Sequence, residues 1–162
     1  FTPVADSKEL ANQIYHPQRL FMDNLFRSIH DIVSFDKTTL ITLLSHKSDA
    51  PFFTQGATPE FLTDVVLLDG MFQTGGAFEF FTDSYVVLPY KIGSLEFMAR
   101  GNKNTNYLCF TTRTASDDET DTYDMDLVDE GGSFLMKLRD FQMVKLNKLT
   151  ADNKISKGVS GR

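Results

Sequence analysis

Residues 64–84 read DVVLLDGMFQTGGAFEFFTDS, the one long run in this chain that predicts a buried helix. Apolar residues recur along it at helical spacing, and further apolar residues fill most of the opposite side. A helix that is apolar nearly all round must be wrapped by other structure. Gly75 and Gly76 each cost about 1 kcal/mol inside a helix, which indicates that a strand or a ligand approaches the backbone closely there.

Asp69 is the unexpected residue on this apolar helix. Gln73, four residues later, shares its face, where a carboxamide can hydrogen-bond a carboxylate and fix its rotamer. Burial makes ionisation costly, so Asp69 must be paired, reach a wet cavity, or stay protonated as a potential acid. The periodicity alone leaves open that Asp69 is a satisfied buried polar group or surfaces at the helix edge.

The composition is that of an ordinary globular domain, with 162 residues, 41% apolar and 23% charged. The net charge of -6 and the scattered basic residues argue against a nucleic-acid partner. No apolar run approaches the ~20 residues that span a bilayer, so we expect no membrane span. The single cysteine, Cys109, lies in an apolar strand-like run. We interpret it as core packing, compatible with a reducing, cytoplasmic location.

The ends of the chain are typical of a segment taken from a longer polypeptide. It begins Phe1-Thr2-Pro3, without an initiator methionine or a signal-peptide pattern, and its last residues are polar. We expect one domain over residues 1–146 and a polar tail or linker over residues 147–162. Processing, or an edited sequence, would give the same start.

Strand patterns lie on both sides of the predicted helix. Alternation with period two predicts a hairpin or one bent strand over residues 27–45. After the helix, turn-rich breaks separate four strand candidates, at residues 85–100, 106–116, 122–128 and 133–146. Short turns between such strands make the sheet antiparallel. The pattern is therefore α+β, with one sheet able to curl around one long central helix.

This order resembles the hot-dog fold, and more narrowly the C-terminal half of the double hot-dog dehydratase domain of polyketide and polyunsaturated fatty acid synthases. Those synthases are multidomain proteins with beta-ketoacyl synthase activity. Residues 67–73, LLDGMFQ, look like the family's LLDxxxQ segment. Three further segments fall in the expected order: residues 20–29 are similar to LFHGPxFQxI, residues 87–93 to LPxxIG, and residues 126–146 to the closing hairpin.

The resemblance implies that Asp69 is the catalytic acid and that Gln73 orients it. Dehydrating a 3-hydroxyacyl thioester takes a base to remove a proton from C2 and an acid to protonate the departing C3 hydroxyl. We expect Gly75 and Gly76, with Pro89 and Tyr90 of the LPxxIG-like segment, to bind the substrate. An acyl carrier protein would present that substrate on its phosphopantetheine arm, and we expect no directly bound cofactor or metal.

The sequence also departs from the family pattern. The family's base is a histidine in an HxxxGxxxxP segment of the N-terminal hot dog, and none of His16, His30 and His46 has that context. Residues 22–24 and 64–65 replace the usual HGP and HP. We therefore expect the base to come from a second hot-dog half or a homodimer partner. Such a partner is expected because one curled sheet leaves an edge strand open for pairing. A non-catalytic hot-dog scaffold or interaction domain, and a hot-dog acyl thioesterase, are the alternatives.

Overall fold

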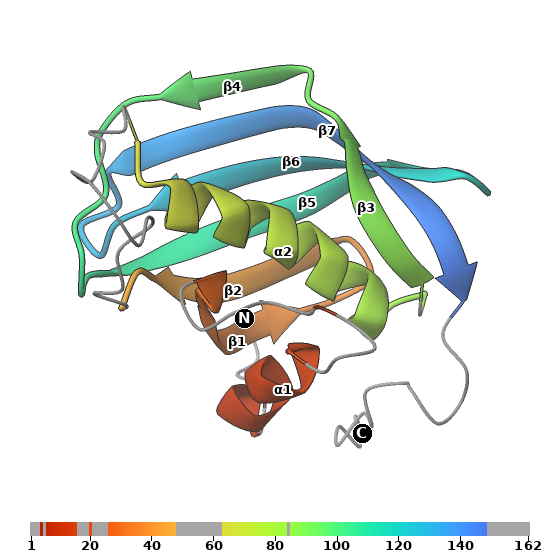
Figure 1. Cartoon of the computed structure of the whole chain (residues 1–162), viewed down its shortest axis with the longest axis horizontal. Coiled ribbons are helices and arrows are strands. Elements are labelled where there is room, and N and C mark those ends of the chain that lie inside the picture. The colour runs from red at the N-terminus through yellow and green to blue at the C-terminus, as the bar shows by residue number, and fades with distance from the viewer. Residues whose placement is uncertain are drawn as a thin grey trace, which may run out of the picture.

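One long helix lies against the concave face of one antiparallel sheet (Figure 1). The structure is a computed structural model, and it describes residues 4, 6–15, 20, 26–47, 63–83 and 85–148. Its helices are α1 (Ser7–Ile14) and α2 (Val65–Phe81). Its strands are β1 (Ile29–Phe35), β2 (Thr39–Ser45), β3 (Tyr85–Lys91), β4 (Ser94–Phe97), β5 (Asn106–Ser116), β6 (Thr120–Val128) and β7 (Phe134–Lys148).

The strands run in the order β1-β2-β5-β6-β7-β3, and β4 also pairs with β7. Every pairing is antiparallel. The sheet bends so that β1 and β2 lie on one side of α2 and β3 and β4 on the other, while α1 packs against β1 (Figure 1). This confirms the predicted α+β architecture of one sheet curled around one central helix.

The single strand predicted over residues 85–100 is wrong, because the structure divides it into β3 and β4. The division lies at Gly93, whose N–H donates to the Asp140 carbonyl at 3.2 Å. A Cβ on Gly93 would lie 2.5 Å from the Asp140 Cβ, and Asp140 has a φ of 51°. At this crossing β7 changes partner, from β4 along its first half to β3 along its second.

The C-terminal end of β7 and the start of α2 also differ from the prediction. β7 extends to Lys148, past the boundary that we set after Leu146, and residues 149–162 lie outside the described part. Helix α2 begins at Val65, because Asp64 is its N-cap rather than its first residue. The Asp64 Oδ1 accepts hydrogen bonds from the Val66 and Leu67 N–H groups at 3.0 and 3.1 Å, which satisfies two of the free donors at the helix start.

Helix α2 is buried on nearly every side, as its sequence predicts. The exceptions are four half-buried residues at spacings of three and four along its first half, which therefore form one stripe. We call these the half-buried stripe: Val65, Leu68, Asp69 and Phe72. The Phe72 ring stacks on Phe141 of β7 with centroids 5.0 Å apart, so this stripe lies near the β7 side of the sheet.

The two glycines of α2 differ in how closely the sheet approaches them. A Cβ on Gly75 would lie 2.7 Å from the Met143 sulfur and 3.1 Å from the Met125 Cε. A Cβ on Gly76 would meet nothing closer than Leu20, at 3.8 Å. The predicted close approach of a strand is therefore confirmed at Gly75, where side chains of β6 and β7 take the space.

We expect Gly75→Ala to be less stable than Gly76→Ala by about 1 kcal/mol, the lower end of the cost of overpacking a core, because the methionine side chains that it meets are flexible. Both substitutions gain the same helix propensity of about 1 kcal/mol, so their difference isolates the contact with Met143. Urea denaturation of the two variants and the parent measures it. Equal free energies of unfolding for the two variants would contradict this account of the packing.

Candidate functional site

Asp69 and Gln73 form a hydrogen-bonded pair on α2. The Gln73 Nε2 donates to the Asp69 Oδ2 over 2.5 Å. Burial raises the pKa of the Asp69 carboxyl, and the hydrogen bond from Gln73 works against that rise. The net upward shift favours the protonated form, so the carboxyl is placed in an environment in which it can donate a proton.

The Gln73 side chain is held at both ends of its amide. It is only 2% exposed, and its Nε2 also donates to the Phe26 carbonyl at 2.7 Å. Its Oε1 accepts from the Tyr15 hydroxyl at 2.8 Å. Tyr15 in turn accepts from the Ile29 N–H at 2.8 Å. Sequence reasoning missed Tyr15, because nothing in the local pattern connects it with residues so distant along the chain.

The four predicted substrate-binding residues lie in other surroundings. Gly75 faces Met125 and Met143, and Gly76 faces Leu20 and Val87. Pro89 and Tyr90 are exposed on β3, with Tyr90 69% accessible. The structure thus brings together Asp69 and Gln73 of the predicted site. The role of Gly75, Gly76, Pro89 and Tyr90 in binding a substrate stays a prediction.

The two described histidines make contacts away from Asp69. His30 on β1 has its Nε2 3.4 Å from the Ser45 carbonyl, and burial together with the Lys47 charge lowers its pKa. His46 is buried, and its Nδ1 lies 2.8 Å from the Asp64 Oδ2. It therefore ties the end of β2 to the N-cap of α2. His16 lies outside the described residues.

A second group of ionisable side chains, which sequence reasoning missed, lies at the other end of α2. Glu79 and Asp121 are both fully buried. The Tyr123 hydroxyl donates to the Glu79 Oε1, and the Arg113 Nη1 lies 3.6 Å from the same oxygen. The Lys145 Nζ lies 3.0 Å from the Asp121 Oδ2. Glu79 is a carboxylate on the same apolar helix as Asp69, so the argument that singled out Asp69 applied equally to it.

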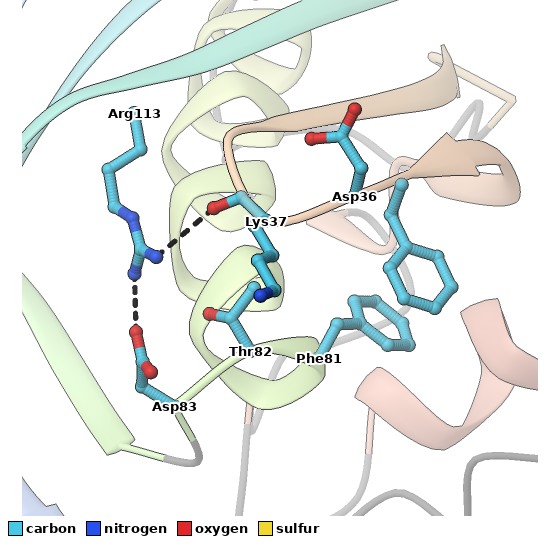
Figure 2. Close-up of a pocket in the computed structure, with 7 residues that line it drawn as sticks. Asp36, Lys37, Phe81, Thr82, Asp83 and Arg113 are labelled. Carbon is cyan, nitrogen blue, oxygen red and sulfur yellow. Dashed lines mark hydrogen bonds and ion pairs between the residues drawn. The ribbon is translucent and has the colours of Figure 1, made fainter.

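A cavity of about 410 Å³ opens beside this group. Figure 2 shows the Arg113 guanidinium between the Asp83 carboxylate and the Lys37 carbonyl, to both of which it donates. The Asp36 carboxylate points away from Arg113 (Figure 2). The cavity is lined by Phe35, Asp36, Lys37, Phe81, Thr82, Asp83 and Arg113. Of the two cationic residues in this lining, Arg113 is thus already paired with Asp83.

The pKa of Glu79 is raised to about 7. Burial is the largest cause and the Asp121 charge adds to it, while the Tyr123 hydrogen bond and the Arg113 charge oppose it. The Glu79 Oε2 is buried and finds no hydrogen-bond partner among the described residues. The folded protein therefore retains a proton on Glu79 at pH values where a free glutamate has lost it.

We expect Glu79→Gln to flatten the pH dependence of stability. The folded state binds this proton more tightly than the unfolded chain, so Glu79 lowers the free energy of unfolding as the pH rises from its ordinary pKa of 4.5 to about 7. The variant should match the parent near pH 5 and exceed it near pH 8, where the carboxylate would be charged. Urea denaturation at both pH values measures this, with Asp118→Asn in an exposed turn as the control. An equal decline in parent and Glu79→Gln would contradict it.

Within its described residues the chain has neither a membrane-spanning helix nor a cluster of metal-binding side chains. Neither α1 nor α2 is long and apolar enough to cross a membrane. No three histidine, cysteine, aspartate or glutamate side chains within the described ranges are placed to hold a metal ion.

The family model that matches this chain is described as the polyketide synthase dehydratase N-terminal domain, and the match covers residues 1–153. No curated protein matches the sequence significantly. The model's description names an N-terminal domain, whereas the LLDxxxQ-like segment led us to expect a C-terminal half. The comparison confirms the resemblance to the dehydratase family and does not confirm the assignment to that half.

Solved structures show the same fold. The dehydratase domain from the CurJ module of curacin polyketide synthase has a TM-score of 0.68 and 18% identity over 90% of this chain and 50% of that one. The dehydratase domain of PpsC from Mycobacterium tuberculosis, in complex with C12:1-CoA, has a TM-score of 0.67 and 17% identity over 88% of this chain and 52% of that one. This chain thus spans about half the length of these dehydratase domains.

A hypothetical thioesterase from Streptococcus pneumoniae, solved with coenzyme A, is also similar. Its TM-score is 0.58, with 12% identity over 74% of this chain and 88% of that one. Together with the dehydratase domains, this likeness confirms the hot-dog fold.

Proposed function

Because the chain belongs to the polyketide synthase dehydratase family, we propose that it is one half of an enzyme that dehydrates 3-hydroxyacyl thioesters, with Asp69 as the acid. The observation that carries this proposal is the half-buried Asp69 carboxyl, held by Gln73 on the central helix. Burial raises its pKa, so it can keep a proton to deliver.

The proposed reaction divides the work between two groups. A base removes the proton from C2, Asp69 gives its proton to the C3 hydroxyl, the C3–O bond breaks, and water leaves with an enoyl thioester as product. The described histidines hydrogen-bond to Ser45 and Asp64. We therefore assign the base to a histidine of a second hot-dog half, and this chain to the half that supplies the acid, which is the C-terminal half in the resemblance.

The substrate is proposed to arrive on the phosphopantetheine arm of an acyl carrier protein. The supporting observation is that the similar PpsC dehydratase domain was solved with an acyl-CoA, and coenzyme A carries the same arm. The half-buried stripe around Asp69 is apolar at its other three positions, Val65, Leu68 and Phe72. Such a surface suits an acyl chain and disfavours a charged substrate.

The second half is proposed to pair along β3 and β4. This edge of the sheet has no further strand beside it among the described residues, whereas β1 at the opposite edge packs against α1. Pro89 on β3 is compatible with an edge position, since proline cannot donate to a neighbouring strand. Large apolar side chains are exposed on or next to these two strands: Leu88, Tyr90, Ile92, Phe97 and Met98. An open apolar edge of this kind favours pairing with another sheet.

We expect Asp69→Asn to lower the rate of dehydration by at least about 100-fold, the lower end of what general acid catalysis contributes. Asparagine keeps the size of the side chain and loses the acidic proton. Its stability should stay within about 1 kcal/mol of the parent. The assay follows enoyl thioester formation from a carrier-bound 3-hydroxyacyl substrate by mass spectrometry, with the chain in its natural polypeptide or combined with its companion half.

Asp118→Asn, in an exposed turn, is the matched control and should keep full activity. Equal turnover by Asp69→Asn and the parent would remove Asp69 from the mechanism. A parent that releases a free acid from the same substrate would identify a thioesterase instead.

We expect the double variant Leu88→Lys, Tyr90→Lys to weaken association with the second half or with another copy. Two charges on the open edge would have to be buried in the interface, which costs free energy unless they are paired. Analytical ultracentrifugation measures the association, and Asp118→Lys serves as a control for added positive charge. If the double variant associates as strongly as the parent, pairing does not use this edge.

A hot-dog acyl thioesterase is the second candidate, and one observation favours it. The chain covers 88% of the similar hypothetical thioesterase but only about half of each dehydratase domain. In that case Asp69 would activate a water molecule, and the product would be a free acid. A non-catalytic scaffold is the third candidate, favoured by the contacts of His30 and His46 away from Asp69.

A further inference from the structure

Tyr15 stands immediately after α1 and reaches into the site described above. Its hydroxyl accepts a hydrogen bond from the Ile29 N–H at 2.8 Å. A phenol has one proton, and here it is directed to the Gln73 Oε1, also at 2.8 Å. The main chain at the start of β1 thus fixes the direction in which Tyr15 donates.

This direction favours the same orientation of the Gln73 amide that the Phe26 carbonyl requires, because a carbonyl can only accept. With Oε1 against Tyr15, the two N–H groups of Nε2 are left for the Phe26 carbonyl at 2.7 Å and the Asp69 Oδ2 at 2.5 Å. Turning the amide over would place Oε1 against the Phe26 carbonyl and the Asp69 Oδ2. It would place Nε2 against the Tyr15 hydroxyl, which already accepts from the Ile29 N–H. The contact with the Phe26 carbonyl would then be repulsive, and the contact with Asp69 would be repulsive whenever its carboxyl is ionised.

We propose that Tyr15 is a positioning residue that acts through Gln73 to keep the transferable proton of Asp69 on Oδ1. Because Oδ2 accepts the Gln73 N–H, a protonated Asp69 carries its proton on the other oxygen, which Gln73 leaves free to donate. With the amide reversed, the Asp69 proton would be held on Oδ2 in a hydrogen bond to Gln73 and lost to the reaction. This inference rests on the proposed role of Asp69 as the acid.

The charges around Tyr15 agree with this role. Burial, and to a smaller extent the Asp69 charge, raise the pKa of the Tyr15 phenol well above its ordinary range. The phenol therefore remains a neutral donor over the pH range in which Asp69 titrates.

The test is a double-mutant cycle in the natural polypeptide or with the companion half present. We expect Tyr15→Phe to reduce kcat by about 10- to 100-fold with little change in KM, since misplacing a catalytic group costs rate rather than binding. In a Gln73→Ala background the same substitution should cost nothing further. An equal loss in both backgrounds would show that Tyr15 acts independently of Gln73 and would overturn the proposal.

A measurement without turnover separates this inference from the proposed function. The Asp69 carboxyl can be titrated by 13C NMR in the parent and in Tyr15→Phe. Loss of the Tyr15 donor removes one of the contacts that hold the amide in this orientation, which weakens its hydrogen bond to Oδ2 and should raise the pKa of Asp69. An unchanged Asp69 pKa in a folded Tyr15→Phe variant would overturn the positioning role. A raised pKa in a protein that dehydrates nothing would leave that role intact and remove only the proposed activity.

Discussion

The absence of a polar face on α2 is the constraint on which the rest of this structure depends. A helix whose side chains are apolar nearly all round cannot lie on a surface, so the sheet must bend around it. That bend brings β1 and β2 to one side of the helix and β3 and β4 to the other (Figure 1). A polar side chain outside the half-buried stripe enters the interior and must find a partner there, as Gln73 and Glu79 both do.

The sequence predicts this architecture well because its signals are local. The period-two runs, the turn compositions and the long apolar stretch each depend on residues close together in the chain. Asp69 and Gln73 were also predictable, since residues four apart on a helix share a face. The division of β3 from β4 was not predictable. It depends on the contact between Gly93 and Asp140, two residues that come together only when β3 and β4 pair with β7.

The rest of the site could not be predicted for the same reason. The hydrogen bond between Tyr15 and Gln73 joins residues separated by the whole of β1, β2 and the start of α2. The group around Glu79 draws its members from α2, β5, β6 and β7. Glu79 could have been predicted, because it is a carboxylate on an apolar helix. The pairing of Asp121 with Lys145 could not, because it depends on the register of β6 against β7, which the sequence pattern does not specify.

The position of Tyr15 between α1 and β1 has a consequence for recombining this chain with a related hot-dog domain. A junction placed just before β1 would preserve every strand and the whole of α2, and the hybrid protein would still fold by the criteria usually applied to swapped domains. It would nevertheless replace the one side chain that bridges the Ile29 amide and the Gln73 carboxamide. Such a hybrid would pass a test of folding but would lack the hydrogen bond from Tyr15 to Gln73, so a junction in this chain belongs upstream of α1.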